Sequence, residues 1–202
     1  MKFTLSAWFI GGLALLVGCT SDEPIPQETQ AWLHDTDGTV LTFQNTSTGV
    51  AEPVEVHIRR ESQRTGSGRF TIRHTRVHQA YLYYYINPQP AVPITGLGLE
   101  FADNQVTVAP DPNYWTDSRI FLQTAADEAQ ETATAETQAS VKLTGIMTLN
   151  GQAYGRCLWG KFTLAKGSQP TKTDDVAEFF YTKDQGLVAY TKANGQMWMR
   201  VK

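Results

Sequence analysis

The chain of 202 residues contains little cysteine and no long apolar segment. Its two cysteines are Cys19 and Cys157. The longest apolar run, Leu5 to Val17, has 13 residues, whereas a membrane-spanning helix needs about 20. The sequence therefore excludes a disulfide-rich scaffold and a bundle of membrane-spanning helices.

Catalytic signatures are also missing from the sequence. It has no G-x-S-x-G elbow, no H-E-x-x-H, no phosphate-binding loop and no paired-cysteine metal motif. Cys157 is flanked by apolar residues, which do not favour a thiolate. His74 and His78 are four residues apart, which on a strand means about 13 Å and is too far to share one metal. We therefore expect no catalytic residue, metal or cofactor, and the acidic balance argues against a nucleic-acid partner.

The first 18 residues have the three parts of an export signal: a positive end with Lys2, an apolar run, and the small residue Gly18 before Cys19. The segment Leu16-Val17-Gly18-Cys19 resembles the lipobox of bacterial lipoproteins. That resemblance implies that the Cys19 thiol carries diacylglycerol, that a signal peptidase cuts before it, and that its amine is acylated. We predict a cleaved signal peptide over 1–18 and a membrane anchor at Cys19. The alternative is a secreted protein whose signal happens to contain a cysteine.

Residues 19–29 are polar, acidic and proline-bearing, so we predict a flexible tether there and a β-rich domain over 30–202. The acidic pair Asp22-Glu23 resembles export signals of surface lipoproteins in Bacteroidota. The segment Phe179–Tyr190 resembles the "FYAKGVGLV"-type ending of small envelope lipoproteins of the same group, although 182–185 departs from that pattern. These resemblances imply the outer membrane, with possible exposure at the cell surface, and they bring no catalytic residues.

Tight turns and alternating apolar runs dominate the rest of the sequence. Turn dipeptides occur at 37–38, 103–104, 150–151 and 194–195, each beside a strand-like segment. We predict an all-β fold of about ten strands, a single antiparallel meander closing as an up-and-down barrel or half-barrel, with a β-sandwich as the alternative. The alanine-rich stretch 125–139 has almost nothing to bury and is predicted to be an acidic loop.

Arginines are concentrated between His57 and His78, where six of them face one glutamate and give a net charge of +5. The guanidinium fork suits phosphate, sulfate and carboxylate groups, so this run predicts an anion-binding patch. The alternative is a solvated outer face. The candidate residues are Arg59, Arg60, Arg69, Arg73 and Arg76.

A tyrosine-rich segment follows the arginines. Tyr81, Tyr83 and Tyr85 are predicted to share one strand face, while Leu82, Tyr84 and Ile86 share the other. We interpret the first face as a candidate surface for a ligand or a partner, because tyrosine combines apolar area with a hydroxyl group. The alternative is simply that strands favour tyrosine.

Taken together, these patterns predict a non-catalytic binding or structural lipoprotein of the cell envelope, with an apolar or anionic ligand such as a lipid, a glycan or an acidic partner. One alternative is a hydrolase of glycans or lipids. Its carboxylates would come from turn-rich segments, with candidates Glu100, Asp103, Asp111 and Asp117. The other alternative is an accessory subunit of an envelope complex, which would present an apolar patch or an open sheet edge.

Overall fold

The structure, a computed structural model, describes residues 20–65, 74–88, 95–109, 119–122, 137–164 and 175–201. The regular secondary structure of the described chain is almost entirely β-strand, as predicted, with one four-residue helix, α1 (Gln27–Gln30). The strands are β1 (Thr20–Glu23), β2 (Val40–Asn45), β3 (Ala51–Thr65), β4 (His74–Ile86), β5 (Thr95–Ala102), β6 (Gln105–Ala109), β7 (Arg119–Phe121), β8 (Thr137–Thr144), β9 (Met147–Leu149), β10 (Gln152–Tyr154), β11 (Cys157–Leu164), β12 (Val176–Thr182), β13 (Gly186–Lys192) and β14 (Met197–Arg200).

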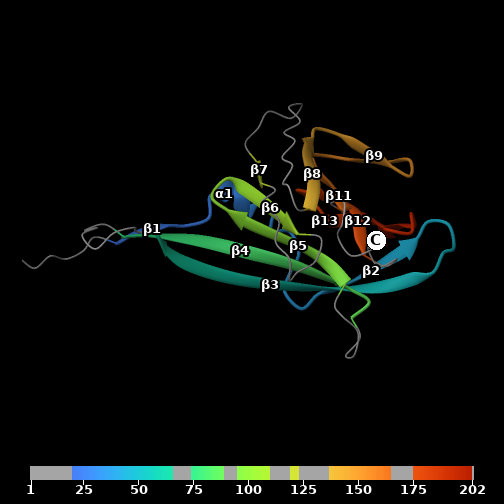
Figure 1. The fold of residues 1–202 in the computed structure, drawn as a ribbon, viewed down its shortest axis with the longest axis horizontal. Coiled ribbons are helices and arrows are strands. Elements are labelled where there is room, and N and C mark those ends of the chain that lie inside the picture. The colour runs from blue at the N-terminus through green and yellow to red at the C-terminus, as the bar shows by residue number, and fades with distance from the viewer. Residues whose placement is uncertain are drawn as a thin grey trace, which may run out of the picture.

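The strands form one antiparallel path that curls almost closed. Its order is β7-β6-β5-β4-β3-β2-β14-β13-β12-β11-β8, and the pairing of β2 with β14 joins the two halves. The ends of the path meet, because Cα atoms of β7 and β8 approach within 8 Å. The predicted antiparallel sheet closing as a barrel or half-barrel is confirmed (Figure 1).

The interior of this barrel is filled with side chains. Strand β2 alternates exposed and buried residues, which is the period of a half-buried strand. The largest fully buried side chains include Trp32, Tyr84, Tyr181, Phe43, Phe101 and Phe179. Gly160 is required under Phe179, because a Cβ atom there would overlap the phenyl ring. The interior is therefore a packed core, which argues against a hollow barrel that holds an apolar ligand.

A short hairpin, β9–β10, forms a separate two-stranded sheet. It covers a second apolar cluster on the outer side of β11–β13 that includes Leu149, Tyr154, Cys157, Phe180 and Val188. The predicted long hairpin around 150–151 is thus divided, since β8 pairs with β11 and only the short inner strands meet at the turn. Burial raises the pKa of the Cys157 thiol to about 12, which makes it an inert core residue.

The segment that follows Cys19 differs from the predicted tether. Residues 20–23 form β1, which pairs in parallel with β4, and residues 27–30 form α1. Ile25 and Thr29 are buried, and the Thr29 hydroxyl donates to the carbonyl oxygen of Asp103. Trp32 then enters the core, where its carbonyl accepts a hydrogen bond from Tyr181. These contacts give the polar segment a fixed place that its composition alone did not predict.

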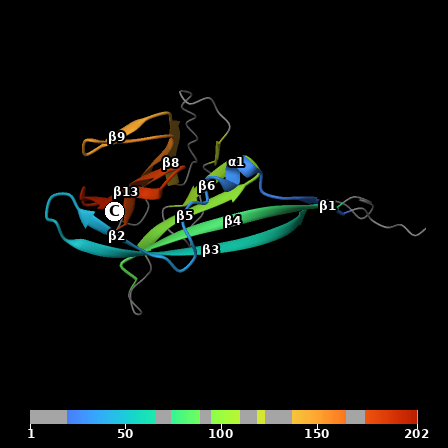
Figure 2. The same cartoon turned by 180° about the vertical axis from the view of Figure 1, so that it is seen from behind.

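Strands β3 and β4 are much longer than their neighbours and extend beyond the barrel as a ribbon, and β1 pairs with β4 at its far end (Figures 1 and 2). Their register is continuous from Val54↔Ile86 to Thr65↔Thr75. Strand β2 pairs only as far as Glu55, and β5 only as far as Gln79. Residues 66–73, which connect the two strands in the sequence, lie outside the described residues.

Candidate functional site

The register of the ribbon separates the arginines between its two faces. Strand side chains alternate, so Arg60 and Arg64 lie on the same face as the buried Val54 and Val56, which we name the inner face. Arg59 lies on the opposite, outer face. On β4, Arg76 and His78 follow the parity of the buried residues 80, 82 and 84 and also lie on the inner face. The predicted patch therefore contains Arg60 and Arg76 but not Arg59, whereas Arg69 and Arg73 lie outside the described residues.

Two arginines stand directly opposite each other on the inner face. The ladder pairs Arg64 with Arg76, and both side chains are exposed. Like charges in directly opposite positions destabilise a strand pair, since their Cβ atoms are about 5 Å apart. Among the described residues, neither these two nor Arg60 forms an ion pair. A bound anion would relieve this repulsion, because guanidinium forks on both sides could donate hydrogen bonds to it.

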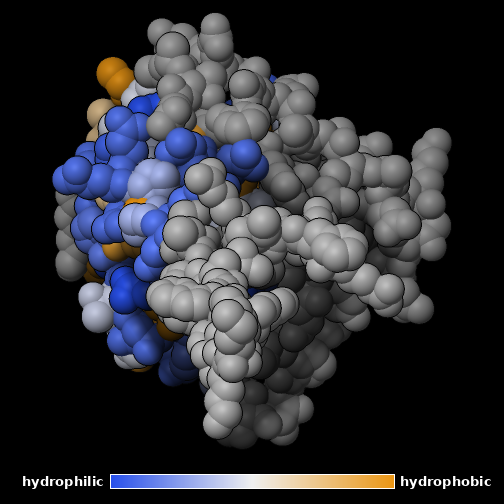
Figure 3. Space-filling view, turned by 90° about the vertical axis from the view of Figure 1, so that its left-hand side faces the viewer, coloured by the Kyte–Doolittle hydropathy of each residue, from blue (hydrophilic) through white to orange (hydrophobic). Residues whose placement is uncertain are grey.

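One carboxylate accompanies this cationic group. Asp22 of β1 pairs with Arg76 in the parallel ladder, and its Oδ1 lies 2.8 Å from the His78 Nε2 atom. The contact orients the imidazole and engages the Asp22 carboxylate, which forms no ion pair with a described arginine. The surface at the ribbon end of the molecule is mainly hydrophilic in its described part (Figure 3).

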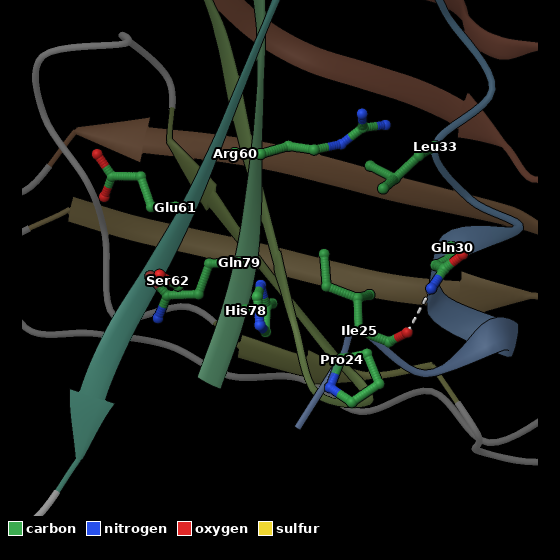
Figure 4. Close-up of a pocket in the computed structure, with 9 residues that line it drawn as sticks. All are labelled: Pro24, Ile25, Gln30, Leu33, Arg60, Glu61, Ser62, His78 and Gln79. Carbon is green, nitrogen blue, oxygen red and sulfur yellow. Dashed lines mark hydrogen bonds between the residues drawn. The ribbon is translucent and has the colours of Figure 1, made fainter. Parts of the chain in front are cut away.

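A groove of about 550 Å³ lies between the inner face and the N-terminal segment. Its lining residues are Pro24, Ile25, Gln30, Leu33, Arg60, Glu61, Ser62, His78 and Gln79. In Figure 4, Arg60 extends from β3 toward Leu33, and Gln30 donates to the Ile25 carbonyl at 2.6 Å. The groove thus combines an apolar wall with a cationic side chain and lies beside the opposed arginines.

The outer face carries the tyrosine ladder, Tyr81, Tyr83 and Tyr85. The rings are nearly parallel, with centroids 6.3 Å and 6.2 Å apart for successive pairs. The predicted sharing of one face is confirmed, because Leu82, Tyr84 and Ile86 are buried on the other. Burial, followed by the nearby Glu100 and Glu61, raises the pKa of Tyr81 to about 12, so this hydroxyl stays protonated at neutral pH.

Ion-paired side chains of β3 and glycines of β5 lie on either side of the tyrosine ladder. Arg59 pairs with Glu61, and the His57 Nε2 atom lies 3.0 Å from a Glu55 carboxylate oxygen. The register places Gly96 and Gly98 of β5 beside Tyr85 and Tyr83. Arg59 therefore belongs to this surface, and a role of the ladder in binding a ligand or partner stays a prediction.

The carboxylates required by the hydrolase alternative do not gather in the groove. Its lining includes one carboxylate, Glu61, which is already paired with Arg59. Glu100 lies on the outer face opposite Tyr81, and Asp103 occupies the β5–β6 turn. Asp111 and Asp117 are outside the described residues. Within the described ranges, no cluster of three or more His, Cys, Asp or Glu side chains could hold a metal ion.

A buried carboxylate that was not predicted from the sequence, Asp35, lies two residues after Leu33, which lines the groove. Asp35 accepts hydrogen bonds from the Tyr84 hydroxyl at 2.6 Å and from Arg200 Nη1 at 3.1 Å. Gly186, at φ +70°, packs against this carboxylate, which a Cβ atom would overlap. Two residues later, Asp37 accepts the Ile58 N–H at 2.7 Å. Together these bonds tie the segment before β2 to the barrel and to the base of the ribbon.

A second buried network lies inside the barrel at Glu52. Its carboxylate accepts a hydrogen bond from the Lys192 ammonium at 2.8 Å and another from the Tyr190 hydroxyl. The ammonium also lies 4.6 Å from the ring centroid of Trp198. Burial raises the pKa of Tyr190, with the Glu52 carboxylate as a further cause, so this hydroxyl remains a donor. All four groups point inward and are structural.

The described chain contains no helix long and apolar enough to cross a membrane. Comparison of the sequence and structure with protein-family models, curated proteins and solved structures gave no match.

Proposed function

We propose that this protein is a non-catalytic lipoprotein of the bacterial cell envelope, anchored through Cys19, whose ribbon binds an anionic ligand on its inner face. The observation that carries the proposal is the placement of Arg64 directly opposite Arg76. Both guanidinium groups are exposed and form no ion pair with a described residue. A fold that holds two like charges together gains stability when a ligand of the opposite charge binds them.

The packing supports an anionic ligand over an apolar one. An apolar ligand needs a concave, largely apolar pocket. The barrel interior is occupied by aromatic rings, and the groove beside the ribbon is bordered by Arg60 and His78. Phosphate, sulfate and carboxylate groups all fit the guanidinium fork, so the ligand class is a phosphorylated or acidic envelope component.

Calorimetric titration with pyrophosphate tests this binding function. The protein is the intact lipidated chain in a non-ionic detergent, and the variant is the double substitution Arg64→Gln and Arg76→Gln. We expect the variant to bind at least about tenfold more weakly, because hydrogen bonds to charged groups contribute about 1.5–3 kcal/mol each. Affinity of the unchanged protein should also fall as salt is added.

The control for this titration is Arg59→Gln, which removes one positive charge from the outer face. It should leave pyrophosphate affinity within about twofold. If the control and the double variant lost the same amount of pyrophosphate affinity, binding would depend only on net charge. That result would contradict a site on the inner face. Unfolding curves of all three proteins check that the ribbon is intact.

The anchor is tested separately with Cys19→Ser. A thioether to diacylglycerol requires the cysteine sulfur, so we expect labelling by a radioactive or clickable fatty acid to disappear and the protein to leave the membrane fraction. Cys157→Ser is the matched control, and it should keep the label because that thiol is buried. Undiminished labelling of Cys19→Ser would refute the lipid anchor.

A further inference from the structure

The parallel pairing of β1 with β4 places Thr20 at one end of the ribbon. Thr20 is the partner of His74, and Glu23 is the partner of Val77, so β1 begins at the far end of the ribbon. Strand β3 ends there at Thr65, and strand β4 begins there at His74. Figures 1 and 2 both show β1 beside this end and the barrel at the other. A lipid on Cys19 would therefore enter the membrane next to the far end of the ribbon.

The opposed arginines occupy that same end. Asp22 pairs with Arg76, only two positions along β1 from Thr20, and Arg76 faces Arg64 across the ribbon. Exposed arginines within a Debye length of an anionic leaflet are attracted to its headgroups. The cationic end of the ribbon and the proposed anchor thus lie together, while the barrel is separated from them by the length of the ribbon.

We propose that the distal inner face of the ribbon docks on anionic phospholipid headgroups of the membrane that holds Cys19, with Arg64 and Arg76 as the contact residues. This proposal rests on the lipid anchor proposed above. The ribbon then acts as a stalk: the ten steps from Glu55 to Thr65 span about 33 Å at about 3.3 Å per residue. The lipid and the arginines would both bind the membrane at the same end of the ribbon. A lipid chain combined with a basic patch makes membrane attachment stable.

Charge and position both favour an anionic membrane as the partner of this face. At its far end the face offers guanidinium groups from Arg64 and Arg76, and the Asp22 carboxylate beside them is engaged by His78. Each arginine near an anionic surface strengthens binding about fivefold. A membrane is also the one anionic surface that the anchor would hold permanently beside Thr20 and His74.

The test uses the lipidated chain with a nitroxide attached through Ser62→Cys, an exposed inner-face position next to Arg64. The protein is reconstituted into vesicles of phosphatidylcholine alone or of an equal mixture with phosphatidylglycerol. The measurement is the accessibility of the nitroxide to an aqueous nickel chelate, by electron paramagnetic resonance. We expect accessibility to fall at least twofold in the anionic vesicles and to recover in high salt. A nitroxide at Thr148→Cys on the exposed β9 should be equally accessible in both.

Charge variants decide whether the arginines cause the protection. Arg64→Gln with Arg76→Gln should abolish the difference between the two vesicles, while Arg59→Gln on the outer face should keep it. Equal accessibility at position 62 in both vesicles, with the protein still co-floating with them, would overturn the docking and leave the lipid anchor standing. Protection by soluble polyglutamate in phosphatidylcholine vesicles, without any effect of phosphatidylglycerol, would overturn it in favour of an acidic protein partner. Failure to float with either vesicle would refute the anchor and this proposal together.

Discussion

Replacing Lys192 with methionine is expected to lower the free energy of unfolding by about 3–5 kcal/mol. The side chains of Lys192 and Glu52 are only 8% and 9% exposed, and their charged atoms are 2.8 Å apart. Methionine keeps much of the volume but leaves the Glu52 carboxylate buried without its cation. The loss is read from the midpoint and slope of urea unfolding.

The double variant Glu52→Gln with Lys192→Met is the control for this prediction. Removing both charges eliminates the uncompensated ion, so stability should return most of the way to that of the unchanged protein. Tyr190 keeps an amide acceptor in this variant. A loss below about 1 kcal/mol in Lys192→Met alone would show that the pair is not desolvated as the structure indicates.

Replacing Asp35 with alanine is expected to cost about 3 kcal/mol of stability and to loosen the groove wall. The substitution removes the acceptor of the buried Tyr84 hydroxyl and the anionic partner of Arg200, which keeps the Gln185 carbonyl as an acceptor. A buried polar group left unsatisfied costs about 1–3 kcal/mol, and the loss of the ion pair adds to it. The segment from Trp32 to Asp37 would lose one of its buried ties to the barrel. Unfolding curves measure the first effect, and amide hydrogen exchange over residues 32–37 measures the second.

Asp37→Ala is the matched control, because Asp37 lies on the same segment but is exposed and accepts only the Ile58 N–H. We expect it to cost about 1 kcal/mol or less. If the two alanine variants were equally stable, Asp35 would not be the residue that holds this segment in place.

Much of the strand and turn pattern could be predicted because it depends on short-range rules. The turns at 103–104, 150–151 and 194–195 were readable because Asp103, Asn150, Gly151 and Gly195 adopt the positive φ that such dipeptides favour. Val54, Val56 and Ile58 alternate with polar residues, which is the sequence pattern of a half-buried strand. The same parity continues to Arg60 and Arg64, so the division of the arginines between two faces was implicit in the sequence.

The remaining features depend on long-range pairing that no local pattern reveals. Residues 20–29 have no apolar period, and β1 gains its place from a ladder with β4, which is more than 50 residues away in sequence. Charged residues are normally expected at the surface, so Asp35 and Glu52 were overlooked. Glu52 shares the parity of Val54 and Val56, which was the available signal, but its partner Lys192 lies 140 residues away.

The central claim, that the opposed arginines bind an anion, is tested most directly by nuclear magnetic resonance of the arginine side chains. Assigned Nε–H signals are followed as inorganic phosphate is added to the intact protein in detergent micelles. We predict saturable shifts for Arg64 and Arg76, with Arg59 on the outer face unmoved. Shifts of equal size at all three arginines, or none that saturates, would contradict a binding site on the inner face of the ribbon.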